Sequence, residues 1–419
     1  MQQLEPPKTS KNSQQTEKLK SWLEEKLSTK QKNRRGLIWL IALLILCTCG
    51  SVVFFQLQMH KVKKKEKILR TTMNKLKYKA IAADCLGKVP TPEKLTNIPF
   101  GEDSGLILGV TPIDIRNVHA PHNPSLIASE SGYHLFFRYD VTSSKAKYVP
   151  YHSHIGVVTL DRDFKQGNQE FKKIPIPSNY TEDPRVTKVK DQIYLTFNML
   201  DEENLRCRCM TLANINEKTF DVNYMTVLDM NLQWIEKNWG SFEYTPKDKE
   251  PELIFEYQIS PRTLFSLPDP TKNELKYLPL PREVAYCSFS WPNKWGQIRG
   301  GTPAQKIGDE YLAFFHSAFT EKKGLVWYVM GAYTFKAEPP FTITRMSPYP
   351  ILFRGIFDAP IANTAQNWKR VIFPSGFVVE KQQDRELIHL ACGENDCAVK
   401  IVTFDKKALL DSLVKFDVE

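Results

Sequence analysis

A repeated pattern of strands and turns constrains the fold of this chain more than any other feature. A small polar loop, a short apolar strand, a polar turn and a second apolar strand occur in this order five times. The copies are HNPSLIASESGYHLFFR (122–138), EDPRVTKVKDQIYLTFN (182–198), KNWGSFEYTPKDKEPELIFEY (237–257), GGTPAQKIGDEYLAFFH (300–316) and FPSGFVVEKQQDRELIHLAC (373–392). The second strands are expected to begin near residues 133, 193, 252, 311 and 386, at intervals of about 60, 59, 59 and 75 residues.

Further strand-like runs follow each copy, for example HIGVVTL (154–160) and YVMGAYTF (328–335), so each unit has enough strands for a four-stranded sheet. Radial repetition of four-stranded sheets is typical of β-propellers. A content of 42% hydrophobic and 11% aromatic residues suits a β-rich globular domain. The sequence predicts an all-β fold, a five-bladed β-propeller; the alternative is a large β-sandwich with coincidental spacing.

The positive charge of the chain is confined to its N-terminal part. The formal net charge is +10, but residues 1–80 alone carry a net +13 and the remaining residues a net −3. Binding to a phosphate backbone requires a basic surface on the folded domain. The charge distribution therefore argues against nucleic acid as a partner.

Residues 37–57, LIWLIALLILCTCGSVVFFQL, are expected to form a transmembrane helix because they are almost entirely apolar and match the thickness of a bilayer. A cleaved signal peptide would have a small-residue cleavage site just after its apolar region, whereas a basic run follows here. We predict a basic tail (1–36), the membrane helix (37–57), a basic stem (58–100) and a glycan-active propeller (101–419). Basic residues flank both ends of the apolar segment almost equally, so the positive-inside rule does not decide the orientation. The layout of an anchor, a stem and a large C-terminal domain favours a single-pass type II protein whose C-terminal domain is lumenal or extracytoplasmic.

The cysteines leave two states open. Six lie outside the apolar segment, and they are either scattered thiols or form one or two disulfides. Their spacing does not indicate a metal site, and we predict none. These cysteines are Cys85, Cys207, Cys209, Cys287, Cys392 and Cys397.

The propeller prediction brings polar residues from distant parts of the chain to one place. The first strand of each blade lines the central channel, so the residues that lead into these strands gather around one mouth. The expected group is Asn123, Asp183 with Arg185, Lys237 with Asn238, Arg299 with Thr302, and the loop 373–376. Carboxylates and amides bind sugar hydroxyls, and the aromatic residues Trp239, Trp291, Trp295 and Tyr257 are expected around the mouth, although Trp239 fits the core of a blade better. The mouth is therefore predicted to be a sugar site.

Asp183 is the candidate general acid of this site, because cleavage or formation of a glycosidic bond needs a proton donor for the bridging oxygen. Nearby cations lower its pKa, so acid function requires partial desolvation. The alternative is that Asp183 and Arg185 only form an ion pair at the end of a strand. Glu182 is excluded, because alternation along a strand would turn it away from Asp183.

Several motifs resemble successive blades of the mannoside phosphorylase and β-1,2-mannosyltransferase group, whose members are five-bladed propellers acting on β-mannosides. The motifs are TEDPRVTKVKDQIYLTFN, EKNWGSFEY, IRGGTPAQKIGDEYLAFFHS, YVMGAYTF followed by PPFTITRMSPYPILF, and CGENDCAVKIV. The similarity covers roughly residues 117–405. It implies a glycosyltransferase or glycoside phosphorylase that uses Asp183 as the general acid or base. The membrane anchor is expected from residues 37–57; it would be unusual for a degradative phosphorylase but suits an enzyme that builds glycans on membrane-bound acceptors.

The resemblance also implies the roles of other residues. Sugar contacts fall to Asn123, Arg138, Asn238 and Asp396, to which the mouth argument adds Arg185 and Thr302. Contacts to phosphate or to a donor phosphate fall to Arg206, Lys237, Arg299 and His316, because a dianion needs several charged donors. Arg138 could instead be a plain ion-pair partner, and His316 a satisfied histidine at a strand end. Tyr257 stands where the phosphorylases carry a histidine that contacts phosphate, so the resemblance does not assign this contact in the present chain.

Two other functions remain as alternatives. A hydrolase of related fold would need a second carboxylate, for which Asp396 is the candidate. A lectin-like propeller would keep the pocket and lack the chemistry. The soluble part contains no nucleotide-binding fold signature and no D-x-D metal motif, so no cofactor is predicted. The expected partners are a glycan, the bilayer, and phosphate, a sugar phosphate or a nucleotide-sugar donor.

Overall fold

A computed structural model describes residues 91–415 of the chain, apart from 142–151, 201–206, 229, 231, 287–288, 322–323 and 362–367, together with Lys18, Ser21 and Met59. The chain divides into two units, Met1–Lys77 and Tyr78–Glu419, and all the sheets lie in the second. Residues 37–57 and Arg206 fall outside the described part. Within that part, no helix is long and apolar enough to cross a membrane.

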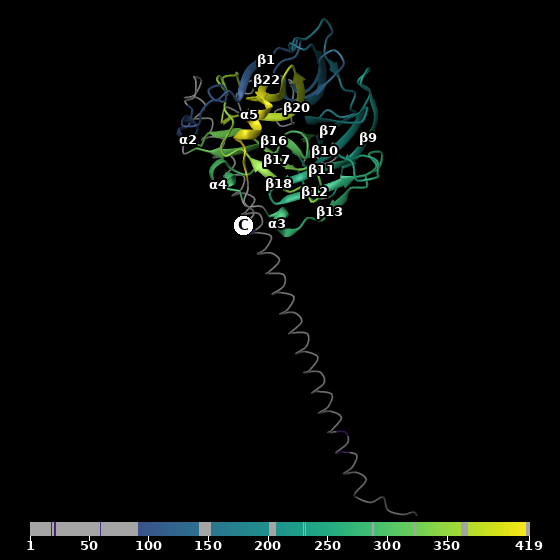
Figure 1. Ribbon diagram of the computed structural model, residues 1–419. Coiled ribbons are helices and arrows are strands. Elements are labelled where there is room, and N and C mark those ends of the chain that lie inside the picture. The colour runs from purple at the N-terminus through teal and green to yellow at the C-terminus, as the bar shows by residue number, and fades with distance from the viewer. Residues whose placement is uncertain are drawn as a thin grey trace, which may run out of the picture. The chain divides into compact units, whose positions relative to one another are not determined.

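The described residues form five sheets that follow one another along the chain (Figure 1). Their strands pair antiparallel, apart from one short parallel pair in the fourth sheet. The first has β2 (His122–Ala128), β3 (Tyr133–Val141), β4 (His152–Leu160) and β5 (Lys172–Lys173). The second has β6 (Thr181–Val189), β7 (Gln192–Leu200), β8 (Arg208–Ile215) and β9 (Val222–Leu228), and the third has β10 (Gly240–Tyr244), β11 (Glu252–Ile259), β12 (Arg262–Leu267) and β13 (Lys276–Leu278).

The last two sheets receive strands from outside their own repeat. The fourth has β14 (Arg299–Gly300), β16 (Glu310–Thr320), β17 (Val326–Lys336), β18 (Ile343–Met346) and the C-terminal β23 (Val414–Lys415), with β15 (Gln305–Lys306) and β19 (Lys369–Arg370) beside this path. The fifth has β20 (Ile372–Gln382), β21 (Arg385–Glu394), β22 (Ala398–Asp405) and β1 (Ile107–Ile113). Short helices are α2 (Glu93–Thr96), α3 (Arg282–Ala285), α4 (Trp291–Trp295) and α5 (Lys406–Ser412).

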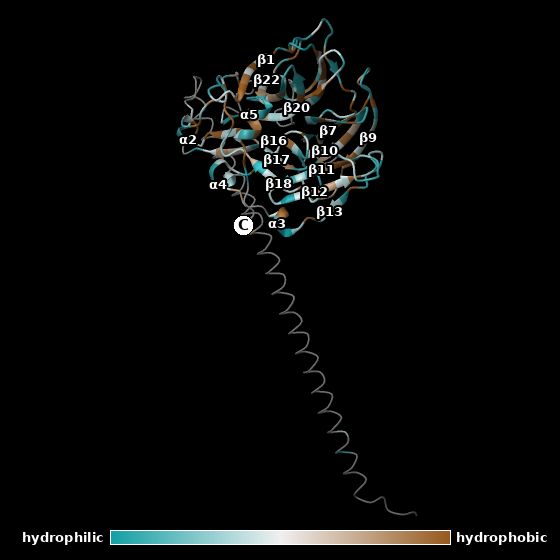
Figure 2. Cartoon of the chain, viewed as in Figure 1, coloured by the Kyte–Doolittle hydropathy of each residue, from teal (hydrophilic) through white to brown (hydrophobic). Residues whose placement is uncertain are grey.

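The predicted hairpins are confirmed. The second strands of the five hairpins begin at residues 133, 192, 252, 310 and 385, each within one residue of the expected position. The reason is local: each strand is an apolar run bounded by turn residues, and such runs define strands reliably. Figure 2 shows apolar residues concentrated on the strands and polar residues on the connecting loops.

Neighbouring sheets pack on each other through separate hydrophobic clusters. In the first sheet, Leu135 and Phe137 pack against the fifth sheet, whereas Phe136 between them packs against the second. Further clusters join the second sheet to the third, the third to the fourth and the fourth to the fifth. Because both faces of each sheet are buried, the sheets succeed one another in a closed order. The fold is therefore all-β and propeller-like.

Pairing of β1 with β22 closes this order. Residues 107–113 precede the first sheet in sequence, yet they form the edge strand of the fifth. The short strand β23 likewise pairs with β18 of the fourth sheet. The sequence repeat did not predict either pairing, because neither segment belongs to a hairpin.

Candidate active site

Three residues at the starts of the first strands share an unusual backbone conformation. Asn123, Asp183 and Asn238 have φ angles of 47°, 58° and 66°. Asn and Asp tolerate this left-handed region better than other residues with a side chain. The pairing of β2 with β3 and of β6 with β7 shifts register at the first two positions. A bulge of this kind redirects a side chain and is common beside active sites.

The redirected side chains meet between sheets. Asn123 Nδ2 donates a hydrogen bond of 2.7 Å to Asp183 Oδ1. Asn238 Oδ1 accepts one of 3.3 Å from Arg185 Nη2. The structure thus brings together residues from three sheets that are about 60 residues apart in sequence.

Asp183 is buried, with 7% of its surface exposed, and Arg138 Nη1 lies 3.4 Å from its Oδ1. Burial alone raises the pKa of Asp183, but Arg138, Arg185, the hydrogen bond from Asn123 and Lys237 together lower it to about 2. Asp183 is therefore ionised at neutral pH.

Arg138 is the centre of a network of carboxylates. Besides Asp183, its guanidinium contacts Asp140 at 3.0 Å and Glu182 at 3.1 Å. Burial alone lowers the pKa of Arg138, but Glu182, Asp140 and Asp183 raise it further than burial lowers it. Glu182 is also bound by Arg208 at 2.7 Å.

The sequence argument left Glu182 out of the site, but the structure places it against Arg138, whose guanidinium also contacts Asp183. Alternation along β6 would turn it away from Asp183, but the bulge between Glu182 and Arg185 interrupts that alternation. Asp140 and Arg208 were also missed. The charged residues that end HLFFRYD could have indicated Asp140, whereas nothing local to Arg208 indicates its contact with Glu182.

Arg185 has no exposed surface, and its guanidinium is used by the protein itself. Nε donates to Gly301 O at 2.6 Å, Nη1 to Asp183 O at 3.2 Å, and Nη2 to Gly300 O at 3.2 Å in addition to Asn238. Burial lowers the pKa of Arg185 to about 10, and Asp183 opposes that shift. Arg185 thus connects the second sheet to the residues that lead into the third and fourth sheets.

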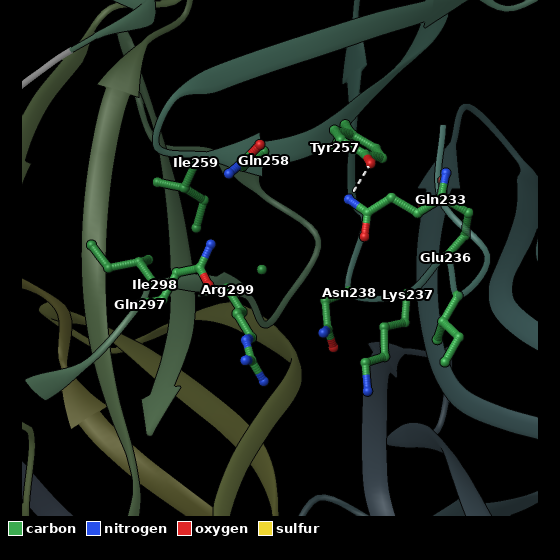
Figure 3. A pocket seen from close by; sticks show the side chains of 12 residues that line it. Gln233, Glu236, Lys237, Asn238, Tyr257, Gln258, Ile259, Gln297, Ile298 and Arg299 are labelled. Atoms are coloured by element: carbon green, nitrogen blue, oxygen red, sulfur yellow. Dashed lines mark hydrogen bonds between the residues drawn. The ribbon is translucent and has the colours of Figure 1, made fainter. Parts of the chain in front are cut away.

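A cavity of about 270 Å³ opens beside these residues. It is lined by Gln233, Ile235, Glu236, Lys237, Asn238, Tyr257, Gln258, Ile259, Gln297, Ile298, Arg299 and Gly300. Figure 3 shows the ends of Lys237 and Arg299 on the same side of the cavity as the Asn238 amide. Within the described part of the chain, neither Lys237 nor Arg299 has an ion-pair partner. Two such cations side by side can bind an anion.

His316 lies on β16 directly opposite Arg299, and only 1% of its surface is exposed. Its ring is 4.4 Å from that of Phe373. Burial, Arg185 and Arg299 lower the pKa of His316 well below its usual value, so the imidazole is neutral. Its Nδ1 is buried without a hydrogen-bond partner among the described residues.

Thr302 and Asp396 are engaged by other parts of the protein. Thr302 is 2% exposed, and its hydroxyl accepts a hydrogen bond of 3.0 Å from the Phe314 amide. Asp396 forms an ion pair with Lys369. Burial alone raises the pKa of Asp396, but Lys369, His122 and Arg138 lower it.

The aromatic surroundings differ from the prediction. Tyr257 lines the cavity, where its hydroxyl accepts a hydrogen bond of 2.6 Å from Gln233 (Figure 3). Trp239 is fully buried in the core, as expected. The expectation that Trp291 and Trp295 border the mouth was wrong, because α4 buries both in the hydrophobic cluster between the third and fourth sheets. Burying a large aromatic side chain in a core is strongly stabilising, which favours the buried positions of both tryptophans.

Cys392 is a buried thiol that donates to Lys400 O at 3.7 Å, and burial raises its pKa. Among the residues described, no three His, Cys, Asp or Glu side chains are grouped to hold a metal ion.

The fold and the cavity define a class: an all-β, propeller-like protein with one buried carboxylate beside cations that can bind an anion. The family model described as beta-1,4-mannooligosaccharide phosphorylase matches residues 94–415. The chain therefore belongs to this family, and the predicted resemblance to mannoside phosphorylases is confirmed. Among curated protein sequences, none matches the chain significantly.

Two solved structures are similar in fold at low sequence identity. One is MPT-4, a mannose phosphorylase from Leishmania mexicana in complex with phosphate ion, with 13% identity, 76% of this chain and 94% of that chain covered, and a TM-score of 0.50. The other is a glycosyl hydrolase from Bacteroides ovatus, with 13% identity, 77% and 94% covered, and a TM-score of 0.50. At this identity the similarity supports the propeller-like fold alone.

Proposed function

We propose that this chain is a glycosyl-transfer enzyme of the mannoside phosphorylase or mannosyltransferase type, a five-bladed propeller that acts on β-mannosides or related glycans. The observation that carries the proposal is a buried carboxylate, Asp183, whose pKa Lys237 helps to lower, beside a cavity that Lys237 and Arg299 both line. Neither cation has an ion-pair partner among the described residues. The description of the family supports the same reaction class.

The reaction needs a proton and an anion at the same place. In phosphorolysis, a phosphate oxygen bonds to the anomeric carbon as the bond from that carbon to the bridging oxygen breaks, and the bridging oxygen takes a proton from Asp183. In synthesis the steps reverse, and ionised Asp183 accepts the proton of the acceptor hydroxyl. An anion bound by Lys237 and Arg299 offsets their positive charge and so raises the pKa of Asp183. Asp183 is thus a base without a bound anion, and a bound anion favours its acid form.

Groups with unused hydrogen-bonding capacity are proposed to contact the ligands. Asn123 Oδ1 is buried without a hydrogen-bond partner among the described residues, so it can accept a bond from a sugar hydroxyl. The unused Nδ1 of neutral His316 is proposed to contact the anion together with Lys237 and Arg299, and Arg206 remains a proposed anion ligand. Arg138, Asn238 and Asp396 are proposed to contact the sugar.

Arg185 and Thr302 were predicted to bind substrate, and their contacts support another role. Both are buried and bonded to the protein backbone. We propose that they hold the site in place and do not touch the ligand.

Hydrolysis is the second candidate, and the ion pairs argue against it. A water-activating carboxylate has to be available across the mouth from the acid. Asp396 is paired with Lys369, and Glu182 is bound by both Arg138 and Arg208. A lectin-like role would leave the cations at the cavity without a purpose.

We also propose that residues 37–57 anchor the enzyme as a type II membrane protein with a lumenal or extracytoplasmic catalytic domain. The support is the apolar sequence. Retention of the full chain in membranes after carbonate washing, with protease protection of the C-terminal domain in sealed vesicles, is the expected result. Release by carbonate would rule out the anchor, and digestion in sealed vesicles would reverse the orientation.

The function is tested with the full chain purified in mild detergent. It is incubated with β-1,4-mannobiose and inorganic phosphate, and separately with GDP-mannose and mannobiose as acceptor. Release of mannose 1-phosphate establishes a phosphorylase, and elongation establishes a transferase. Release of free mannose without phosphate would support the hydrolase instead.

A further inference from the structure

Three exposed apolar residues stand immediately before the cavity residues Glu236 and Lys237. Leu232 is 48% exposed, Trp234 is 71% exposed and Ile235 is 49% exposed. Trp234 is the only exposed tryptophan among those that the structure describes. A tryptophan this open to solvent is uncommon and marks a surface that contacts something. We call Leu232, Trp234 and Ile235 the ledge.

The ledge is held by the backbone of the second sheet. Arg208 N donates to Trp234 O at 2.9 Å, and Glu236 N donates to Arg208 O at 2.9 Å. Arg208 and Ile235 form a parallel bridge. The guanidinium of the same Arg208 binds Glu182, which neighbours Asp183. The ledge is therefore fixed relative to the proposed catalytic carboxylate.

The cavity side of the ledge is fixed as well. The Gln233 amide nitrogen of the backbone donates to Glu236 at 2.8 Å, and its side chain donates to Tyr257. Gln233 and Ile235 line the cavity. Trp234 stands between these two cavity residues, at a bend of the chain, and does not itself line the cavity. A chain that leaves the cavity at this point passes over the ledge.

We propose that the ledge binds a pyranose unit of the glycan beyond the units held in the cavity, with the sugar ring stacked on Trp234. This proposal rests on the proposed function, because it identifies the substrate class of the same mouth as oligosaccharides longer than a disaccharide. The apolar face of a pyranose suits the face of an indole, and a tryptophan with two rotatable side-chain bonds loses little entropy on binding. Leu232 and Ile235 are further exposed apolar side chains close to Trp234 in the sequence.

The test compares substrate lengths in the full-length protein. The variants are Trp234→Ala, Trp234→Phe, which keeps an aromatic face, and the control Tyr286→Ala, which removes an aromatic residue that is 69% exposed and does not line the cavity. The value of kcat/KM is measured with inorganic phosphate, and the elongation rate with GDP-mannose, for β-1,4-mannobiose to mannohexaose. For Trp234→Ala we expect a loss that grows with chain length to about tenfold, equivalent to about 1.4 kcal/mol. Trp234→Phe should recover most of it, and Tyr286→Ala should match the wild type.

Equal effects of Trp234→Ala at all lengths, or no effect at any length, would overturn the proposal. Failure of the proposed function can be distinguished from failure of the ledge proposal. If the wild type turns over no mannoside, the binding of mannohexaose to the wild type and the variants is measured by calorimetry. Binding that is lost in Trp234→Ala and kept in Asp183→Asn would support the ledge, and binding that Trp234→Ala leaves intact would refute it. Flotation of the wild type with phosphatidylcholine vesicles through Trp234, without a length effect on mannosides, would assign the ledge to a membrane and also refute it.

Discussion

Replacement of Arg185 should show how strongly one buried guanidinium holds the site together. Arg185 donates four hydrogen bonds, to the carbonyl oxygens of Gly300, Gly301 and Asp183 and to the Asn238 amide. In Arg185→Lys the charge remains, but a single ammonium has three donors, so at least one buried acceptor is left unsatisfied. Such an acceptor costs about 1–3 kcal/mol.

Arg185→Met is expected to be worse. It removes the Arg185 donor from all four acceptors and removes a cation that lowers the pKa of Asp183. Each buried acceptor that loses its donor costs about 1–3 kcal/mol, and Arg185→Met removes more donors than Arg185→Lys. The free energy of unfolding should therefore fall from the wild type to Arg185→Lys and again to Arg185→Met. The pKa of Asp183 should rise in Arg185→Met.

The assay is equilibrium urea unfolding of the full chain, followed by tryptophan fluorescence. Arg116→Lys is the matched control, because Arg116 is exposed and its replacement should change stability by less than about 0.5 kcal/mol. If Arg185→Lys unfolds at the same urea concentration as the wild type and the control, the guanidinium geometry does not matter and the reasoning is refuted.

Three further predictions concern the same mouth. In Gly393→Ala the new Cβ would lie 2.6 Å from the backbone nitrogen of Asn123 and 3.0 Å from its Oδ1, so Asn123 should move and its bond to Asp183 should weaken. Turnover should fall, and the free energy of unfolding should fall by about 1–3 kcal/mol. Unchanged turnover would show that this bond is dispensable. The pKa of Asp183 falls on folding from 3.8 to about 2, so its ionised form contributes about 2 kcal/mol to the free energy of unfolding. This contribution is present above pH 3.8 and is lost as the pH falls through 2. If the free energies of unfolding of the wild type and Asp183→Asn change in parallel between about pH 4 and 2, the prediction is contradicted. Lys237→Ala and Arg299→Ala should each raise the KM for phosphate about tenfold or more, because each removes a charged donor, while the KM for mannobiose changes less; an unchanged KM for phosphate would place the anion elsewhere.

Local patterns in the sequence were sufficient to predict the repeat and the convergence of its loops. Strands such as YHLFFR are apolar runs bounded by turns, and each hairpin is complete within about 20 residues. The residues that lead into the first strands come together because the sheets succeed one another in a closed order. For that reason Asp183 contacts Asn123 and Arg138, two residues that the sequence analysis had already placed at the site.

The remaining contacts depend on features that are not local. The left-handed φ of Asp183 creates the bulge that brings Glu182 to Arg138, and alternation along a strand predicts the opposite. The pairing of β1 with β22 joins segments almost 300 residues apart. Trp295 was placed at the mouth by its residue type, but a tryptophan is equally suited to a core, and only the packing of α4 decides between them.

The central claim is that Asp183 gives its proton to the leaving group of a mannoside. The most direct measurement compares the wild type and Asp183→Asn in phosphorolysis of β-1,4-mannobiose and of 2,4-dinitrophenyl β-mannoside. The second substrate has a leaving group that needs no proton. We predict that Asp183→Asn loses about 10²- to 10⁴-fold in kcat/KM on mannobiose and retains most of its activity on the dinitrophenyl mannoside. An equal loss on both substrates, or no loss on mannobiose, would contradict the assignment of Asp183 as the general acid.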